Sequence, residues 1–219
     1  KYFMIKKVKA SLSEKILFIF LISLGIFAFS SFFLLKNKCL FVDEVNLKNT
    51  NFTNPENIAV MNIECGNVVI ELYPDISPNA VERFKTLINK KSYDGSAFYK
   101  VVEDTLIQAG DLEFGNKEYL DYSKIGSGKS GLGLLKSELN DEFEFTEGSV
   151  GFARTTEFNS EDSEFFITLK EIPIYQGEYT PLGKVIYGLD ILRKIKTGNK
   201  AIYVLRPDYI NTFRMFNSN

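Results

Sequence analysis

The sequence contains no histidine and no tryptophan among its 219 residues, and it contains only two cysteines. Without histidine the chain cannot form a Ser-His-Asp or Cys-His catalytic arrangement, and it cannot bind a metal ion through imidazole. Cys39 lies beside an apolar segment and Cys65 lies in a predicted turn. This placing predicts two free thiols rather than a structural disulfide.

Acidic residues dominate everything beyond the N-terminal part of the chain. Residues 1–38 hold seven lysines and one glutamate, whereas the remainder carries a net charge of −8. An acidic domain repels a phosphate backbone, so we expect no nucleic-acid partner. The Gly-rich span Gly126–Gly133 lacks the spacing of a phosphate-binding P-loop, and it predicts a turn-rich flap instead.

The N-terminal segment predicts a membrane-spanning helix. Residues 16–35 carry no charge and are apolar on all faces, and a helix of this length reaches about 30 Å, the thickness of a bilayer core. The basic flank at residues 1–15 favours a single-pass signal anchor with the following domain on the non-cytoplasmic side, periplasmic in a bacterium. Two alternatives are a secretory signal cleaved near Ala28-Phe29-Ser30 and a buried core helix.

Residues 36–56 form a polar linker in this prediction, residues 57–197 form the domain, and residues 198–219 form a C-terminal strand or tail that completes it. Many short strands with two helices indicate an antiparallel barrel or sandwich. Ser77 is expected to cap a helix that starts at Pro78 and ends near Asn89. Strands are predicted at 58–64, 68–73, 98–102, 107–109, 149–153, 165–169 and 183–185, and a second helix at 189–195.

Five sequence blocks occur in a distinctive order. They are FYKVVEDTLIQAGD from Phe98, the Gly-rich span with Asp141-Glu142-Phe143, GSVGFAR from Gly148, NSEDSEFFITL from Asn159, and YQGEYTPLGKVIYGLDILRKI from Tyr175. Together they resemble the cyclophilin family of peptidyl-prolyl cis-trans isomerases. The resemblance implies a mainly β domain, an eight-stranded antiparallel β-barrel capped by two α-helices. Side chains would fill the interior, so the active groove would lie on the outer surface.

Isomerisation of an X–Pro bond places few demands on the protein. The rotation barrier is about 18–20 kcal/mol, and lowering it requires no nucleophile, metal ion or proton shuttle. It requires an apolar pocket for the proline ring and a donor aimed at the twisted amide nitrogen, which becomes a hydrogen-bond acceptor. A chain without histidine can supply both, and we expect no metal and no cofactor.

The resemblance also implies roles for individual residues. Lys100 stands at the position of the family's catalytic arginine, and Gln108 at that of the glutamine that positions the arginine and the substrate carbonyl. Because strand residues alternate, only one of Phe165 and Phe166 faces inward, and we predict that Phe166 faces the groove. The implied substrate-binding residues are Leu106, Ala153, Glu164, Phe166, Tyr175 and Tyr179.

Several positions depart from the family's pattern. Lys100 keeps the positive charge but loses the planar fork of arginine, and loss of one positioned donor costs roughly a hundred- to thousandfold in rate. Thr105 stands where a pocket phenylalanine is usual, Glu164 replaces a glutamine, and Tyr179 replaces a frequent histidine. Ile174 replaces a frequent tryptophan, which argues against tight cyclosporin binding.

The sequence therefore predicts a membrane-anchored, monomeric peptidyl-prolyl isomerase of reduced activity. It would bind proline-containing polypeptides and assist the folding of exported proteins. One alternative is a non-catalytic proline-peptide-binding module on the same barrel. A second is an assembly subunit of an envelope complex that uses another surface.

Overall fold

The structure, a computed structural model, describes residues 11–36, 38–40, 42–43, 45–198 and 203–216. Most of the predicted basic flank, and residues 199–202 and 217–219 of the predicted tail, lie outside the described residues. The chain divides into two compact units, residues 1–40 and 41–219. Each unit is described by itself.

The first unit contains one long helix, α1 (Leu12–Lys36). Its stretch Leu12–Leu34 has the length and the apolar composition needed to cross a membrane, and none of it is buried. An N-terminal signal sequence has the same properties. The helix covers the uncharged run 16–35 and begins four residues before it.

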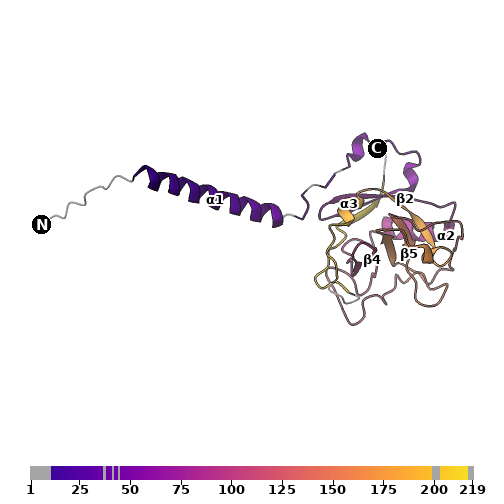
Figure 1. The fold of residues 1–219 in the computed structure, drawn as a ribbon. Helices are drawn as coiled ribbons and strands as arrows, with labels where there is room; N and C mark the ends of the chain where they lie inside the picture. Colours follow the sequence, from indigo (N-terminus) through magenta and orange to yellow (C-terminus); the bar gives the residue numbers. More distant parts are fainter. Residues whose placement is uncertain (1–10, 37, 41, 44, 199–202, 217–219) are drawn as a thin grey trace. The chain divides into compact units, whose positions relative to one another are not determined.

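The second unit is built on one eight-stranded antiparallel sheet with the strand order β3-β4-β6-β5-β7-β2-β1-β8. The segments that lead into the two edge strands meet: Ala97 and Tyr209 form an antiparallel bridge, and Phe98 N–H donates to Asp208 O over 3.0 Å. The curled sheet confirms the predicted antiparallel barrel (Figure 1). The strands are β1 (Ile58–Ile63), β2 (Gly66–Leu72), β3 (Lys100–Val102), β4 (Leu106–Ala109), β5 (Ser149–Phe152), β6 (Phe165–Thr168), β7 (Pro181–Tyr187) and β8 (Thr212–Met215).

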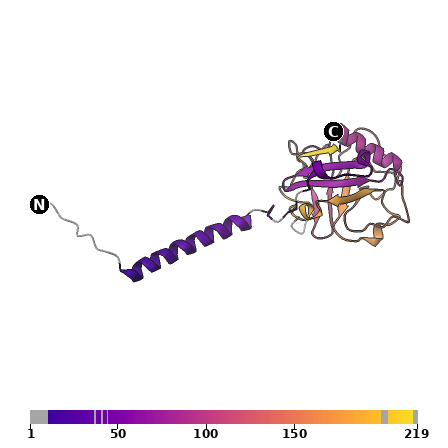
Figure 2. The same cartoon turned by 90° about the horizontal axis from the view of Figure 1, so that it is seen from above.

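Helices cover the sheet at two places. Helix α2 (Pro78–Asn89) lies beside β8, the yellow arrow in Figure 2. Its Phe84 ring contacts the rings of Phe165 and Phe213 with centroids 5.3 and 5.6 Å apart, inside the core. Helix α3 (Leu189–Leu192) contacts β2 and is shorter than the predicted 189–195.

The start of α2 differs from the prediction. The Ser77 hydroxyl makes no capping bond, and it has no hydrogen-bond partner among the described residues. The Glu138 carboxylate replaces it, accepting from the N–H groups of Asn79 (3.2 Å) and Ala80 (2.8 Å). A carboxylate is the stronger acceptor at a helix N-terminus, and it comes from a loop that local sequence rules do not consider.

The segment between α1 and β1 contains two short 3-10 helices, η1 (Leu47–Asn49) and η2 (Pro55–Asn57). Between them, the Phe52 ring packs against the rings of Tyr187 and Phe216, with centroids 6.5 and 4.9 Å apart. This part of the predicted linker therefore lies along the domain.

The prediction of two free thiols was wrong, because Cys39 and Cys65 are both disulfide-bonded. The prediction weighed each cysteine by its neighbours along the chain. Those neighbours do not determine which sulfur atoms the fold brings together.

Edge strand β8 is attached to the loop after α2 by one carboxylate. Asp94 accepts two hydrogen bonds from the Arg214 guanidinium (2.7 and 2.6 Å) and one from Phe213 N–H (3.1 Å). These bonds hold the pKa of Asp94 below its ordinary value, with the Arg214 bonds the largest cause.

We predict that Asp94→Asn lowers the free energy of unfolding by about 1 kcal/mol at pH 7, the upper end for a partly exposed ion pair. A depressed pKa stabilises the fold above the unfolded pKa of about 3.9, and this contribution disappears as pH falls through the folded pKa. Urea unfolding of the full-length chain, followed by tyrosine fluorescence, should show the gap closing below pH 4. An equal gap at pH 7 and pH 3 would contradict the assignment.

Candidate active site

The outer face of the sheet carries a row of residues from four adjacent strands. Lys100 on β3 pairs with Gln108 on β4, Gln108 pairs with Phe166 on β6, and Phe166 pairs with Gly151 on β5. Directly paired residues project to the same side of a sheet. Phe165 belongs to the inner core, so its neighbour Phe166 lies on the outer face, as the alternation predicts. We call these four residues the outer row.

Phe166 is the centre of a ring cluster that we call the aromatic pad, formed by Phe145, Phe166, Tyr175 and Tyr179, in which both phenylalanines are buried and both tyrosines are partly buried. The Phe166 ring centroid lies 5.6 Å from that of Phe145 and 5.3 Å from those of both tyrosines. A Cβ atom on Gly151 would lie 2.7 Å from the Phe166 ring and 2.9 Å from the Phe145 ring. Glycine at this position therefore lets the rings lie directly on β5.

The other apolar residues predicted for the site lie on, or next to, the same strands. Leu106 is buried and lies two residues before Gln108 on β4, so it projects to the same outer face. Ala153 follows β5 directly. Ile174, which stands where the resemblance implies a tryptophan, is 78% exposed.

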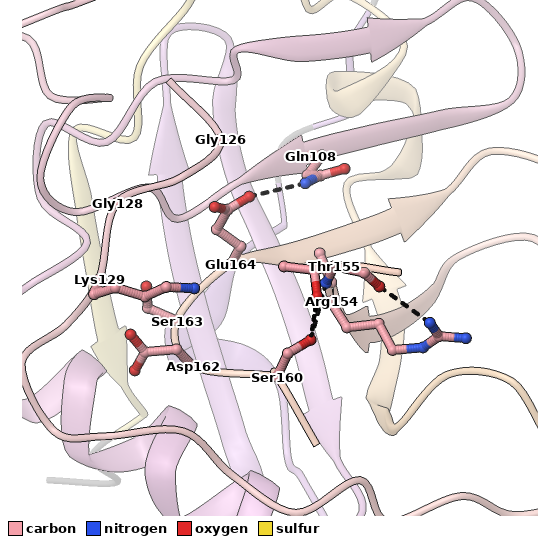
Figure 3. Close-up of a pocket in the computed structure, with 11 residues that line it drawn as sticks. Gln108, Gly126, Gly128, Lys129, Arg154, Thr155, Ser160, Asp162, Ser163 and Glu164 are labelled. Atoms are coloured by element: carbon pink, nitrogen blue, oxygen red, sulfur yellow. Dashed lines mark hydrogen bonds between the residues drawn. The ribbon is translucent and has the colours of Figure 1, made fainter. Parts of the chain in front are cut away.

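A polar triad joins Gln108 of the outer row to Tyr99 and Glu164. The Tyr99 hydroxyl donates to the Glu164 carboxylate, and Gln108 Nε2 donates to the Tyr99 oxygen. Gln108 Nε2 also donates to Glu164 Oε2 over 2.9 Å, the bond drawn between them in Figure 3. Burial raises the pKa of Glu164 above its ordinary value, against the opposing effect of these hydrogen bonds. Burial also raises the pKa of the Tyr99 phenol, so Tyr99 remains a donor.

A polar cavity of about 90 Å³ opens beside the triad. It brings together three of the predicted site residues, Gln108, Ala153 and Glu164, with side chains of the segment before β6 (Figure 3). The Arg154 guanidinium at its edge is bonded to Glu178 (3.1 Å). Its lining residues are Gln108, Gly126, Gly128, Lys129, Ala153, Arg154, Thr155, Ser160, Asp162, Ser163 and Glu164.

The Gly-rich span is held against the site by Asp111. This fully buried carboxylate accepts from the N–H groups of Gly126 (2.6 Å) and Gly128 (3.1 Å), and from that of Phe114 (2.8 Å). A Cβ atom on Gly128 would lie 2.0 Å from the Asp111 carboxylate. The predicted flap is therefore an anchored loop, and its glycines permit close approach to the carboxylate.

Lys100 is partly buried, and within the described part of the chain its ammonium group makes no hydrogen bond or ion pair. Sequence reasoning missed three residues that the site uses: Tyr99, Phe145 and Gly151. Tyr99 could have been found from the sequence, because it directly precedes Lys100 in one of the five blocks that carry the resemblance. Phe145 and Gly151 become visible only through strand pairing.

The comparisons with known proteins agree with this geometry. The sequence profile of the family described as "Cyclophilin type peptidyl-prolyl cis-trans isomerase/CLD" matches residues 58–214. A probable peptidyl-prolyl cis-trans isomerase of Brucella suis is 38% identical over 149 residues, which cover 68% of this chain and 76% of that protein. A peptidyl-prolyl cis-trans isomerase of Schizosaccharomyces pombe is 29% identical over 134 residues, or 59% and 79% of the two chains.

A solved structure shares the fold. The Cryptosporidium parvum cyclophilin-type isomerase, crystallised in the presence of the dipeptide Ala-Pro, superposes with a TM-score of 0.63 at 25% identity, covering 74% of this chain and 99% of that one. The chain belongs to the cyclophilin-type peptidyl-prolyl cis-trans isomerase family. It is a peptidyl-prolyl cis-trans isomerase.

Adjacent phenylalanines allow the inner and outer faces to be tested separately. We predict that Phe165→Leu lowers the free energy of unfolding by about 1–3 kcal/mol through the core, and leaves the activity per folded molecule unchanged. Phe166→Leu should instead lower kcat/KM for an Ala-Pro peptide at least about tenfold, because it removes the ring at the centre of the pad. Denaturation and isomerisation assays on both variants decide this, and the reverse pattern would show that the two faces are wrongly assigned.

Proposed function

We propose that this isomerase is anchored in a membrane and acts as a monomer on proline-containing segments of exported polypeptides, with Lys100 as its catalytic donor. The observation that carries the proposal is the outer row. It places a cation, which makes no hydrogen bond or ion pair among the described residues, and an amide in one row with Phe166, the centre of the aromatic pad. Leu106 lies on the same face, two residues before Gln108 on β4.

The proposed mechanism uses differential binding. The aromatic pad holds the proline ring while the preceding residue rotates about the amide bond. As conjugation is lost the prolyl nitrogen becomes an acceptor, and the Lys100 ammonium donates to it only in this twisted state. Gln108 positions Lys100, while Ala153, Glu164 and Tyr179 bound the groove that receives the flanking peptide.

Lysine at position 100 limits the rate in this proposal. We predict that Lys100→Arg raises kcat and kcat/KM together, by up to about a hundredfold, because the guanidinium fork engages Gln108 and the substrate at once. Lys100→Ala should lower both toward the uncatalysed rate, since the lost contact exists only in the transition state. The measurement is the isomerisation rate on a proline tetrapeptide at equal folded concentration.

Lys117→Ala provides the matched control, because Lys117 is exposed and its side chain makes no hydrogen bond or ion pair within the described chain. Its rate should equal that of the wild type. Equal rates for wild type, Lys100→Ala and Lys100→Arg would reject the catalytic role of Lys100.

A second candidate function is a proline-peptide-binding module with negligible turnover. It is favoured by the same feature that limits catalysis, a lysine without the planar fork. In that case peptide affinity would depend on Phe166 and Leu106, and it would not change with the residue at position 100. Titration with a proline peptide, followed by chemical shift changes, separates the two functions.

Three features support a membrane location with the domain outside the cytoplasm. Helix α1 has the length and composition of a membrane span, and the lysines precede it in excess, which favours a cytoplasmic N-terminus. Both cysteines are disulfide-bonded, and disulfides persist in oxidising compartments.

We predict that the full-length chain stays in the membrane fraction after carbonate washing, and that protease added outside spheroplasts digests the domain. Thiol alkylation of the unfolded, unreduced chain should label neither cysteine. A chain released by carbonate, or protected from external protease with two reactive thiols, would show that the anchor or its orientation is wrong.

A further inference from the structure

The polar triad fixes the orientation of the Gln108 side-chain amide. Within the described residues Gln108 donates through Nε2 to two acceptors, the Tyr99 oxygen and Glu164 Oε2. These two acceptors are bonded to each other and lie on the same side of Nε2, so the amide nitrogen faces Tyr99 and Glu164. The amide oxygen points away from Glu164 (Figure 3) and receives no donor within the described residues.

We propose that Tyr99 and ionised Glu164 are positioning residues of the isomerase site: they hold the Gln108 nitrogen and so fix its oxygen as the acceptor for Lys100. The inference rests on the proposed function, since it concerns the same site. Lys100 and Gln108 are direct cross-strand partners on the outer face, and the ammonium of a lysine can donate to the amide oxygen while keeping two donors for the substrate.

The ionisation of Glu164 controls this arrangement. A carboxylate accepts a hydrogen bond about twice as strongly as a neutral oxygen, so protonation weakens the hold on Gln108 Nε2 and on the Tyr99 hydroxyl. The amide is then free to rotate and to turn its nitrogen toward Lys100. The Lys100 ammonium only donates, so it cannot form a hydrogen bond with that nitrogen. Lys100 is no longer held over the prolyl nitrogen.

The groups that face Glu164 come from three elements besides its own. Tyr99 precedes β3 and Gln108 lies on β4, and both favour the carboxylate by donating to it. Asp111 after β4 opposes ionisation, and Lys129 in the Gly-rich span favours it. Burial outweighs the favourable contacts, so the pKa of Glu164 lies above its ordinary value.

The test measures kcat/KM of the full-length chain on an Ala-Pro peptide between pH 8 and pH 4.5, by exchange NMR without a coupling protease. For the wild type we expect kcat/KM to fall about tenfold as pH is lowered, the effect of one charged hydrogen bond. Glu164→Gln should give a flat profile near the low-pH value. Tyr99→Phe should move the midpoint to higher pH, because it removes a donor that favours the carboxylate.

A second measurement does not depend on activity. The side-chain amide signal of Gln108 should titrate with the same midpoint as kcat/KM in the wild type and should stop titrating in Glu164→Gln. Lys100→Arg should keep the pH dependence, because arginine remains charged throughout. Two exposed matched controls, Glu118→Gln and Tyr119→Phe, should reproduce the wild-type profile.

The possible outcomes separate the two proposals. Absence of activity at every pH, with the Gln108 signal still titrating, would overturn the proposed function and leave the geometry of the triad standing. An active enzyme with a flat profile, or a Tyr99→Phe midpoint equal to that of the wild type, would overturn the positioning role. A profile that disappears in Lys100→Arg would assign the pH dependence to Lys100 and would also overturn it.

Discussion

The antiparallel register of β3, β4, β6 and β5 is the constraint on which the rest of the site depends. Because side chains alternate along a strand, one pairing decides which residues enter the core and which reach the outer face. The observed pairing places Phe165 inside and Phe166 outside, and it brings Lys100 and Gln108 into one row with Phe166. A slip by one residue would bury the amide and the lysine and expose the core.

Two carboxylates, the buried Asp111 and the partly exposed Glu138, hold irregular parts of the domain around that sheet. Asp111 is saturated by backbone N–H groups of the Gly-rich span, and Glu138 saturates the first turn of α2. In each case the acceptor lies far along the chain from at least one of its donors, so it connects segments that have no strand pairing of their own. The Gly-rich span is therefore positioned by hydrogen bonds to a buried carboxylate, which few water molecules can replace.

The sequence predicted the strands, the long apolar helix and α2, because these depend on periodicity and on end signals along the chain. It also predicted that Phe166 rather than Phe165 faces outward. It did not predict the capping of α2 by Glu138 or the disulfide linkage of the cysteines, since both depend on distances across the fold. The contributions of Tyr99 and Gly151 were missed for the same reason: each acts on a neighbour from another strand.

The two departures nearest the reaction centre, Lys100 and Glu164, are physically connected through Gln108. An arginine carries its own planar fork, so it can donate to the glutamine oxygen through one N–H group and still direct another at the substrate. A lysine is a single point charge and requires an acceptor at a fixed place. A glutamate at position 164, unlike a glutamine, can only accept when ionised, so it selects the amide orientation that supplies this acceptor. Lys100 and Glu164 are therefore energetically coupled through Gln108, and the effect of changing either one on activity depends on the other.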